Sequence, residues 1–246
     1  LLTLLGPGGT GKTRLAFEVA RRAAQTDDTL YPDGVYFVSL TPLTDAEYIV
    51  STIAQAIDFH FFEQKDPRQQ LLNHLSDRAL LLVLDNFEHL LEGAPLVAEL
   101  LAAAPRVKVL TTSRERLNVQ EEWVLEVGGM RIPDEPIPLE HVEQYSAIQM
   151  FLQGARRAKA DFVPTLENLP SIMRICRAVE GMPLAIELAA SWVRTLTPDD
   201  IAAELTRSLD ILETPSRNVP ERHRSMRAMM RHTWSLLTPA ERETFQ

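Results

Sequence analysis

A glycine-rich segment near the start of the chain has the residue types and spacing of a phosphate-binding loop. Glycine tolerates positive φ, and we expect positive φ at all four glycines here, which would turn backbone N–H groups toward phosphate oxygens. The flanking residues read as a buried strand before the loop and a helix after it, which is the context that such a loop requires. The segment predicts ATP or ADP binding, and a chance glycine turn is the alternative. Its residues are Gly6, Pro7, Gly8, Gly9, Thr10, Gly11, Lys12 and Thr13.

The charged and hydroxyl side chains at the end of this loop have distinct expected roles. Lys12 would reach the β and γ phosphates as a point charge. The Thr13 hydroxyl would bind Mg²⁺, a hard cation that prefers oxygen ligands. Arg14 follows directly and is counted with the nucleotide-binding residues.

A carboxylate at the end of an apolar strand gives the second signal. Residues 80–84 are all aliphatic and are followed by Asp85. Ligands of open α/β sheets bind at the carboxyl ends of the strands, so we expect Asp85 to hold Mg²⁺ through water. The next residue, Asn86, can orient a water molecule but cannot take its proton. Glu88 is the nearby carboxylate that could act as a base, or it could simply be solvated.

A further predicted strand covers residues 107–112 and is followed by Ser113 and Arg114. The order of these segments resembles the P-loop class in which this strand is inserted between the strand before the glycine loop and the strand that ends in Asp85, and that resemblance implies the same position here. Arg114 would then present its guanidinium to the γ phosphate, with hydroxyls from Thr111 and Thr112 nearby. A solvated surface arginine is the alternative. Lys12, Asp85 and Arg114 are therefore the candidate catalytic residues.

The composition limits the classes of function. The net charge is −9, which disfavours DNA binding by this segment. The single cysteine, Cys176, allows no internal disulfide and suits a reducing cytoplasm. The chain has no run of 18 apolar residues, so we expect no membrane insertion. The six histidines lack the spacing of a metal site.

Strand-like and helical runs alternate over the first half of the chain, which predicts an α/β fold with a parallel sheet flanked by helices. Three prolines at 133, 136 and 138 then predict a linker that can act as a hinge, and helical patterns follow it. The predicted helices include one capped by Thr44, one over 90–104, one that begins at His141, and one capped at residues 197–200. We expect a longer parent protein, because the chain starts inside a strand. The predicted divisions are a nucleotide-binding domain at 1–130, a linker at 131–139, a helical domain at 140–213, and a further domain that starts at 214–246.

Four motifs together resemble the NB-ARC core of the STAND class of signalling ATPases, as found in large bacterial transcriptional regulators with tetratricopeptide sensor regions. The resemblance implies a P-loop NTPase domain, a small helical domain and the start of a winged-helix domain at 214–246. It also implies that Pro183 packs against the adenine or ribose. The motifs are the glycine loop, the run LLLVLDNFEHL at 80–90, TTSR at 111–114, and GMPLA at 181–185.

These observations predict a regulatory ATP/ADP switch with slow hydrolysis. The expected partners are the sensor and effector domains of the parent chain and, on activation, a second copy of the protein. A metabolic or motor P-loop ATPase or kinase is one alternative. A nucleotide-binding scaffold without hydrolysis, in a defence protein, is another, because Asn86 is no base.

Overall fold

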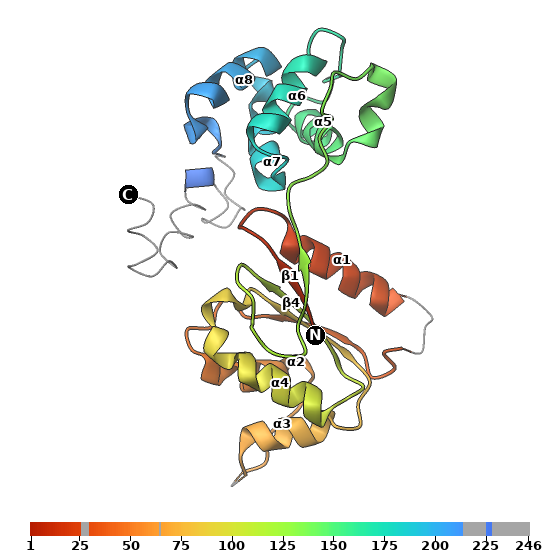
Figure 1. The fold of residues 1–246 in the computed structure, drawn as a ribbon, viewed down its shortest axis with the longest axis vertical. Coiled ribbons are helices and arrows are strands. Elements are labelled where there is room, and N and C mark those ends of the chain that lie inside the picture. The colour runs from red at the N-terminus through yellow and green to blue at the C-terminus, as the bar shows by residue number, and fades with distance from the viewer. Residues whose placement is uncertain (26–29, 64, 214–224, 228–246) are drawn as a thin grey trace. The chain divides into compact units, whose positions relative to one another are not determined.

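The computed structural model describes residues 1–25, 30–63, 65–213 and 225–227, which form two compact units (Figure 1). The first unit comprises Leu1–Pro7 and Lys12–Val127. The second comprises Gly8–Gly11 and Gly128–Gln246. The expected start of a winged-helix domain, 214–246, lies outside the described residues except for 225–227.

A five-stranded parallel sheet organises the first unit, and its strand order is β2-β3-β4-β1-β5. Strand β4 therefore lies between the strand before the glycine loop and the strand that ends in Asp85, as the sequence predicted. This order brings the carboxyl ends of β1, β3 and β4 to one edge of the sheet. The strands are β1 (Leu2–Leu5), β2 (Val35–Ser39), β3 (Leu81–Asp85), β4 (Lys108–Ser113) and β5 (Trp123–Glu126).

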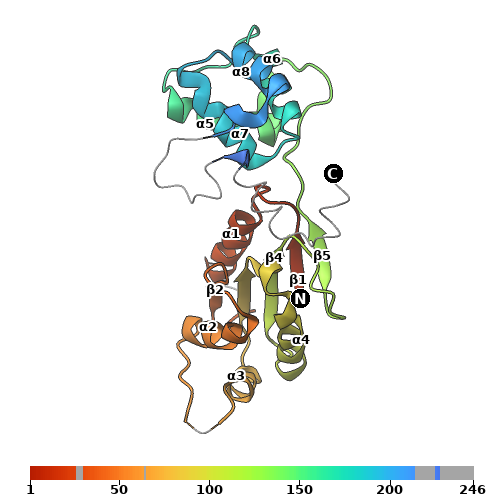
Figure 2. The same cartoon turned by 90° about the vertical axis from the view of Figure 1, so that its left-hand side faces the viewer.

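Helices cover both faces of this sheet (Figure 2). Helix α1 (Lys12–Gln25) packs Ala16 and Ala20 on one face. Helices α2 (Ile49–Ala56), α3 (Pro67–Leu75) and α4 (Ala94–Ala103) cover the other. Strand β3 is buried along its whole length because its residues alternate between these two cores, which explains its unbroken aliphatic sequence.

Three helix starts differ from the sequence prediction. The prediction that Thr44 caps a helix was wrong. The side chain of Asp45 accepts the Glu47 N–H instead and caps a 3₁₀ turn, Ala46–Tyr48, which precedes α2. The predicted helix at 90–104 begins only at Ala94, after 3₁₀ turns at Phe87–His89 and Leu91–Gly93. The helix predicted from His141 is a 3₁₀ segment, Leu139–Gln144, followed by α5.

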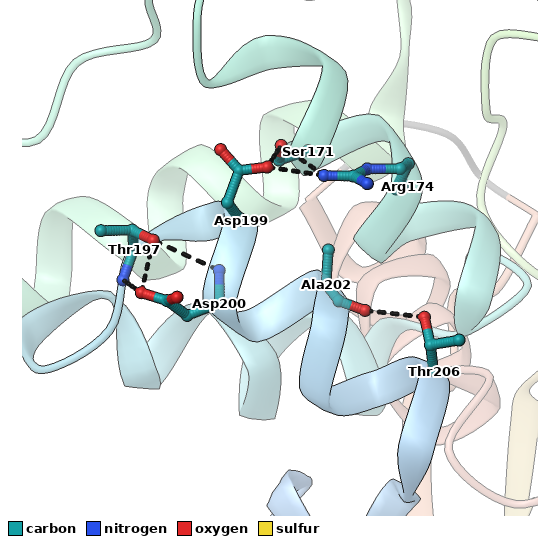
Figure 3. A network of polar contacts seen from close by, with 7 residues as sticks. All are labelled: Ser171, Arg174, Thr197, Asp199, Asp200, Ala202 and Thr206. Atoms are coloured by element: carbon teal, nitrogen blue, oxygen red, sulfur yellow. Dashed lines mark hydrogen bonds and ion pairs between the residues drawn. The ribbon is translucent and has the colours of Figure 1, made fainter.

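The second unit is helical and has its own apolar core. Helix α8 begins with the predicted capping box, in which Thr197 and Asp200 satisfy each other's backbone N–H groups (Figure 3). Asp199 accepts hydrogen bonds from Ser171 and Arg174, which join α8 to α6. The helices are α5 (Ser146–Ala158), α6 (Leu169–Ala178), α7 (Pro183–Ser191) and α8 (Pro198–Arg207), with 3₁₀ segments at Trp192–Arg194 and Leu209–Ile211.

The proline-rich segment 131–139 belongs to this second unit. Arg177 donates hydrogen bonds to the carbonyls of Pro133 and Asp134, at 2.8 and 2.7 Å from Nη2. Ile132 and Ile137 pack against the helical core. The segment is thus bound along the helical unit, although its prolines keep it out of regular structure.

Cys176 lies in α6 and has no exposed surface. Burial raises the pKa of its thiol to about 12. We expect the native protein to react with iodoacetamide at pH 8 at least ~100-fold more slowly than the unfolded chain, because the thiolate is the nucleophile. Mass spectrometry with and without denaturant measures this ratio, and equal rates would contradict the burial of Cys176.

Among the described residues, no helix is both long enough and apolar enough to cross a membrane.

Candidate functional site

The glycine loop connects the end of β1 at Leu5 to the start of α1 at Lys12. Gly9 and Gly11 have φ values of 81° and 89°, a region that residues with a Cβ rarely adopt. Gly6 and Gly8 do not have positive φ, so that part of the prediction was wrong. Two positive-φ positions suffice to turn the loop between the strand and the helix.

Lys12 is largely buried at the first position of α1. Its Nζ donates hydrogen bonds to the carbonyls of Gly6 at 2.5 Å and Pro7 at 2.9 Å, so the ammonium group lies against the loop. The Lys12 pKa is lowered to about 8, mainly by burial and to a smaller extent by the nearby Arg114. Glu88 and Asp85 act in the opposite direction, with Glu88 having the larger influence. An anion bound here would favour the charged form of Lys12.

Asp85 is held by the neighbouring strand. The Thr112 hydroxyl donates to Asp85 Oδ1 at 2.7 Å and accepts the Asn86 N–H at 2.8 Å. Thr111, the other threonine expected near phosphate, forms a hydroxyl hydrogen bond to Thr3 at 2.9 Å. Both hydroxyls therefore bind within the sheet, and Thr112 fixes the direction of the Asp85 carboxylate.

Asn86 has a left-handed backbone conformation, with φ 71°. Its Nδ2 lies 3.1 Å from His89 Nδ1, and His89 Nε2 lies 3.1 Å from the Leu43 carbonyl. The His89 ring therefore bridges the Asn86 side chain and the Leu43 carbonyl through its two nitrogens. The Asn86 amide thus stabilises the turn after β3.

Glu88 and Arg114 form an ion pair beside these residues, with 3.0 Å between Glu88 Oε1 and Arg114 Nε. The two side chains are 5% and 14% exposed. The other carboxylate oxygen of Glu88, Oε2, is buried and has no hydrogen-bond partner among the residues that the structure describes. The sequence left the direction of Glu88 open. The sequence signal for Glu88 was its position three residues after Asp85. Its pairing with Arg114 could not be predicted, because Arg114 is distant in the sequence.

The remaining predicted site residues lie at helix starts. Thr13 and Arg14 are exposed in the first turn of α1. Pro183 is the first residue of α7 in the second unit, and it follows Gly181, whose φ is 67°.

The residues present fit a magnesium ion bound with a nucleotide. The Thr13 hydroxyl and the Asp85 carboxylate offer oxygen ligands, the type that Mg²⁺ prefers. The described residues contain no cluster of three or more histidine, cysteine or acidic side chains that could hold a metal ion. Mg²⁺ commonly keeps several waters and takes phosphate oxygens as further ligands, so such a cluster is not required.

A separate pocket of about 680 Å³ lies elsewhere in the first unit, between α2, α3 and the start of α4. Its wall carries Glu47, Asp66 and Glu92 as well as Arg68, and none of the predicted site residues lines it.

Comparison with known proteins identifies the fold. The Aeropyrum pernix ORC2 protein in its ADPNP–ADP complexes superposes with a TM-score of 0.51 over 84% of this chain and 60% of that one, at 16% identity. A family model described as an AAA domain matches residues 1–119. The chain has the fold of a P-loop NTPase. The glycine loop follows β1 and Asp85 ends β3, so both lie at the carboxyl edge of the sheet, as the strand order predicts.

Curated relatives of this chain occur in mycobacteria. A Mycobacterium tuberculosis protein provisionally named as an HTH-type transcriptional regulator is 35% identical over all of this chain. An uncharacterized protein of the same organism is 31% identical over 98% of it. The chain spans 26% of the length of the first relative and 58% of the second.

Proposed function

We propose that this P-loop NTPase is a regulatory switch of the STAND type, with an NB-ARC-like core, which binds ATP or ADP together with Mg²⁺. In this proposal the bound nucleotide determines the arrangement of the two units, and its slow hydrolysis resets the switch. The name of the mycobacterial relative supports a role in transcriptional regulation, exerted through other parts of a longer protein.

The main support for the proposal is the group of charged residues in the first unit. Lys12 lies against the loop, Asp85 ends β3, and Arg114 follows β4 next to it. Glu88, Arg114 and Asp85 each influence the pKa of Lys12 through their charges, which supports this grouping. Such a group can bind a triphosphate, place Mg²⁺ at Asp85 and Thr13, and contact the γ phosphate through Arg114.

The second unit supplies the proposed response. Pro183 would contact the base or sugar of the nucleotide, since a proline at the first turn presents a rigid apolar surface without losing a hydrogen bond. We place the hinge at Gly128, before the segment 131–139 in which the prolines first suggested it. A nucleotide that contacts both units shifts their arrangement only by its difference in affinity between the two states.

A nucleotide-binding scaffold without hydrolysis is the second candidate. The observation that favours it is the Asn86 amide, which binds His89 and lacks basicity. Hydrolysis measurements separate this candidate from the switch, and a dependence of turnover on an added phosphate acceptor would indicate a kinase instead.

We expect micromolar ADP and ATP affinity and steady-state hydrolysis below the ~1 to 100 s⁻¹ that is typical of kinases, because no acidic residue directly follows Asp85. Calorimetry measures binding, and phosphate release measures turnover. Lys12→Ala controls for a contaminating ATPase. Undetectable nucleotide binding would refute the proposal, and turnover above ~1 s⁻¹ for the chain alone would contradict slow resetting.

Nucleotide-dependent rearrangement has its own measurement. Cysteines at Ser51 and Lys159, both exposed, place one spin label in each unit, while the buried Cys176 stays unlabelled. The switch predicts different label-to-label distance distributions with ADP and with a non-hydrolysable ATP analogue. Pro183→Gly should reduce that difference. If the parent protein gives identical distance distributions with ADP and with the ATP analogue, the bound nucleotide does not change the arrangement of the two units, and the switch is refuted.

A further inference from the structure

One carboxylate oxygen beside the proposed nucleotide site lacks a partner. Glu88 is buried, yet its Oε2 accepts no hydrogen bond from the residues that the structure describes. Burying a charged oxygen without a donor costs stability, so native proteins keep such atoms mainly where they have a use. Glu88 therefore differs from the exposed Glu92 nearby, which water can solvate.

The local structure fixes the direction of the Glu88 side chain. Asn86 turns the chain after β3 in a left-handed conformation, and its N–H is held by Thr112. The 3₁₀ turn Phe87–His89 follows, with the Phe87 side chain fully buried. Glu88 is thus set by the same two strands that position Asp85, and not by a mobile surface loop.

Arg114 contacts only one of the two carboxylate oxygens of Glu88 through its Nε. Its Nε binds Oε1, which leaves Oε2 as the oxygen without a protein donor. A guanidinium has five N–H donors in a planar fork, so one arginine can contact both a carboxylate and a phosphate.

We infer that Glu88 is the catalytic base for ATP hydrolysis, displaced by three residues from Asp85, and that Arg114 links it to the γ phosphate. This inference rests on the proposed nucleotide binding. The free oxygen Oε2 would accept a hydrogen bond from the attacking water. Asn86 would then have no direct catalytic part.

The proposed reaction is balanced without another reactant. The water oxygen forms a bond to the γ phosphorus as the bond from that phosphorus to the β–γ bridging oxygen breaks, with its electron pair leaving on ADP. One water proton passes to Glu88 Oε2 and is then released to the phosphate product or solvent. The products are ADP and inorganic phosphate.

Glu88→Gln tests the inference in the whole chain, because glutamine keeps the shape and an acceptor for Arg114 Nε but loses basicity. We expect single-turnover hydrolysis to fall ~100-fold or more, within the range of general-base effects. Affinities for ATP and ADP should stay within about threefold of the parent. Glu92→Gln is the matched control on an exposed carboxylate. Asn86→Gly, which tolerates the positive φ, should change turnover far less.

Arg114→Ala completes the test. It should weaken ATP binding more than ADP binding, because only ATP has a γ phosphate. Since Arg114 holds Glu88, adding Glu88→Gln to Arg114→Ala should cost much less turnover than it costs alone. Additive effects would refute the link between the two residues.

The outcomes separate the inference from the proposed function. Parent protein that binds no nucleotide refutes the proposed function itself. Parent protein that hydrolyses ATP, with Glu88→Gln equally active, overturns the inference while nucleotide binding stands. Parent protein that binds ATP but never hydrolyses it also overturns the inference and supports the scaffold. Equal weakening of ATP and ADP binding by Glu88→Gln would assign Glu88 a structural role.

Discussion

Replacing Lys12 with alanine is expected to weaken ATP and ADP binding by about 100-fold. The ammonium group lies against the loop through the carbonyls of Gly6 and Pro7, within reach of an anion bound there. Hydrogen bonds to charged groups contribute ~1.5 to 3 kcal/mol each, and ~1.4 kcal/mol corresponds to a tenfold change in affinity. Losing about two such bonds to phosphate gives the expected factor. Titration calorimetry with each nucleotide measures it.

Two companion variants make the Lys12 result specific. Lys12→Met keeps most of the side-chain volume, so it should lose affinity to a similar extent if charge is the cause. Lys159→Ala removes an exposed lysine from α5's C-terminal end and should bind nucleotide like the parent. Thermal unfolding checks that each variant folds. Affinity within threefold of the parent for both Lys12 variants would show that the loop does not hold phosphates through this residue.

Gly129→Ala should destabilise the helical unit, whereas Gly128→Ala should not. A Cβ at Gly129 would lie 1.9 Å from the backbone carbonyl oxygen of Glu180, and this backbone cannot yield as a flexible side chain would. A Cβ at Gly128 would have nothing within 4 Å. Overpacking typically costs ~1 to 3 kcal/mol, and we expect Gly129→Ala to reach at least the middle of that range.

The clash would also disturb the contact that follows it in the chain. Met130 N–H donates to the Gly181 carbonyl at 2.7 Å, and Gly181 itself has φ 67°. At ~2 to 4 °C per kcal/mol for a protein of this size, the melting temperature of Gly129→Ala should fall by more than about 4 °C. Calorimetry or circular dichroism measures the shift. Equal melting temperatures for Gly128→Ala and Gly129→Ala would contradict a stabilising role for the close packing at Gly129.

Local signals in the sequence were enough to predict much of the fold. The glycine loop before Lys12 requires a strand on one side and a helix on the other, and both are present. The aliphatic run that ends in Asp85 is a strand buried on both faces. The α8 capping box depends on Thr197 and Asp200 alone, so its prediction was confirmed.

Other features depend on contacts between distant residues, which a single sequence does not reveal. Glu88 and Arg114 form an ion pair although they are 26 residues apart in the sequence. Thr112 in β4 donates a hydrogen bond to Asp85 in the adjacent strand β3. Asp45 is the N-cap in place of the predicted Thr44, because both residue types can cap a helix and the sequence does not distinguish between neighbours. The prolines of 131–139 indicated irregular structure correctly, but the Arg177 contacts that bind this segment lie more than 40 residues away.

The short connection between the two units has a consequence for effective concentration. Val127 N–H is bound to the Leu5 carbonyl of the sheet, and Met130 N–H is bound to the Gly181 carbonyl of the helical unit. The connection between these anchors therefore contains only residues 128 and 129. A short tether keeps its two ends at an effective concentration in the millimolar range or above. The switch proposed above would therefore act between two parts of one chain at this effective concentration.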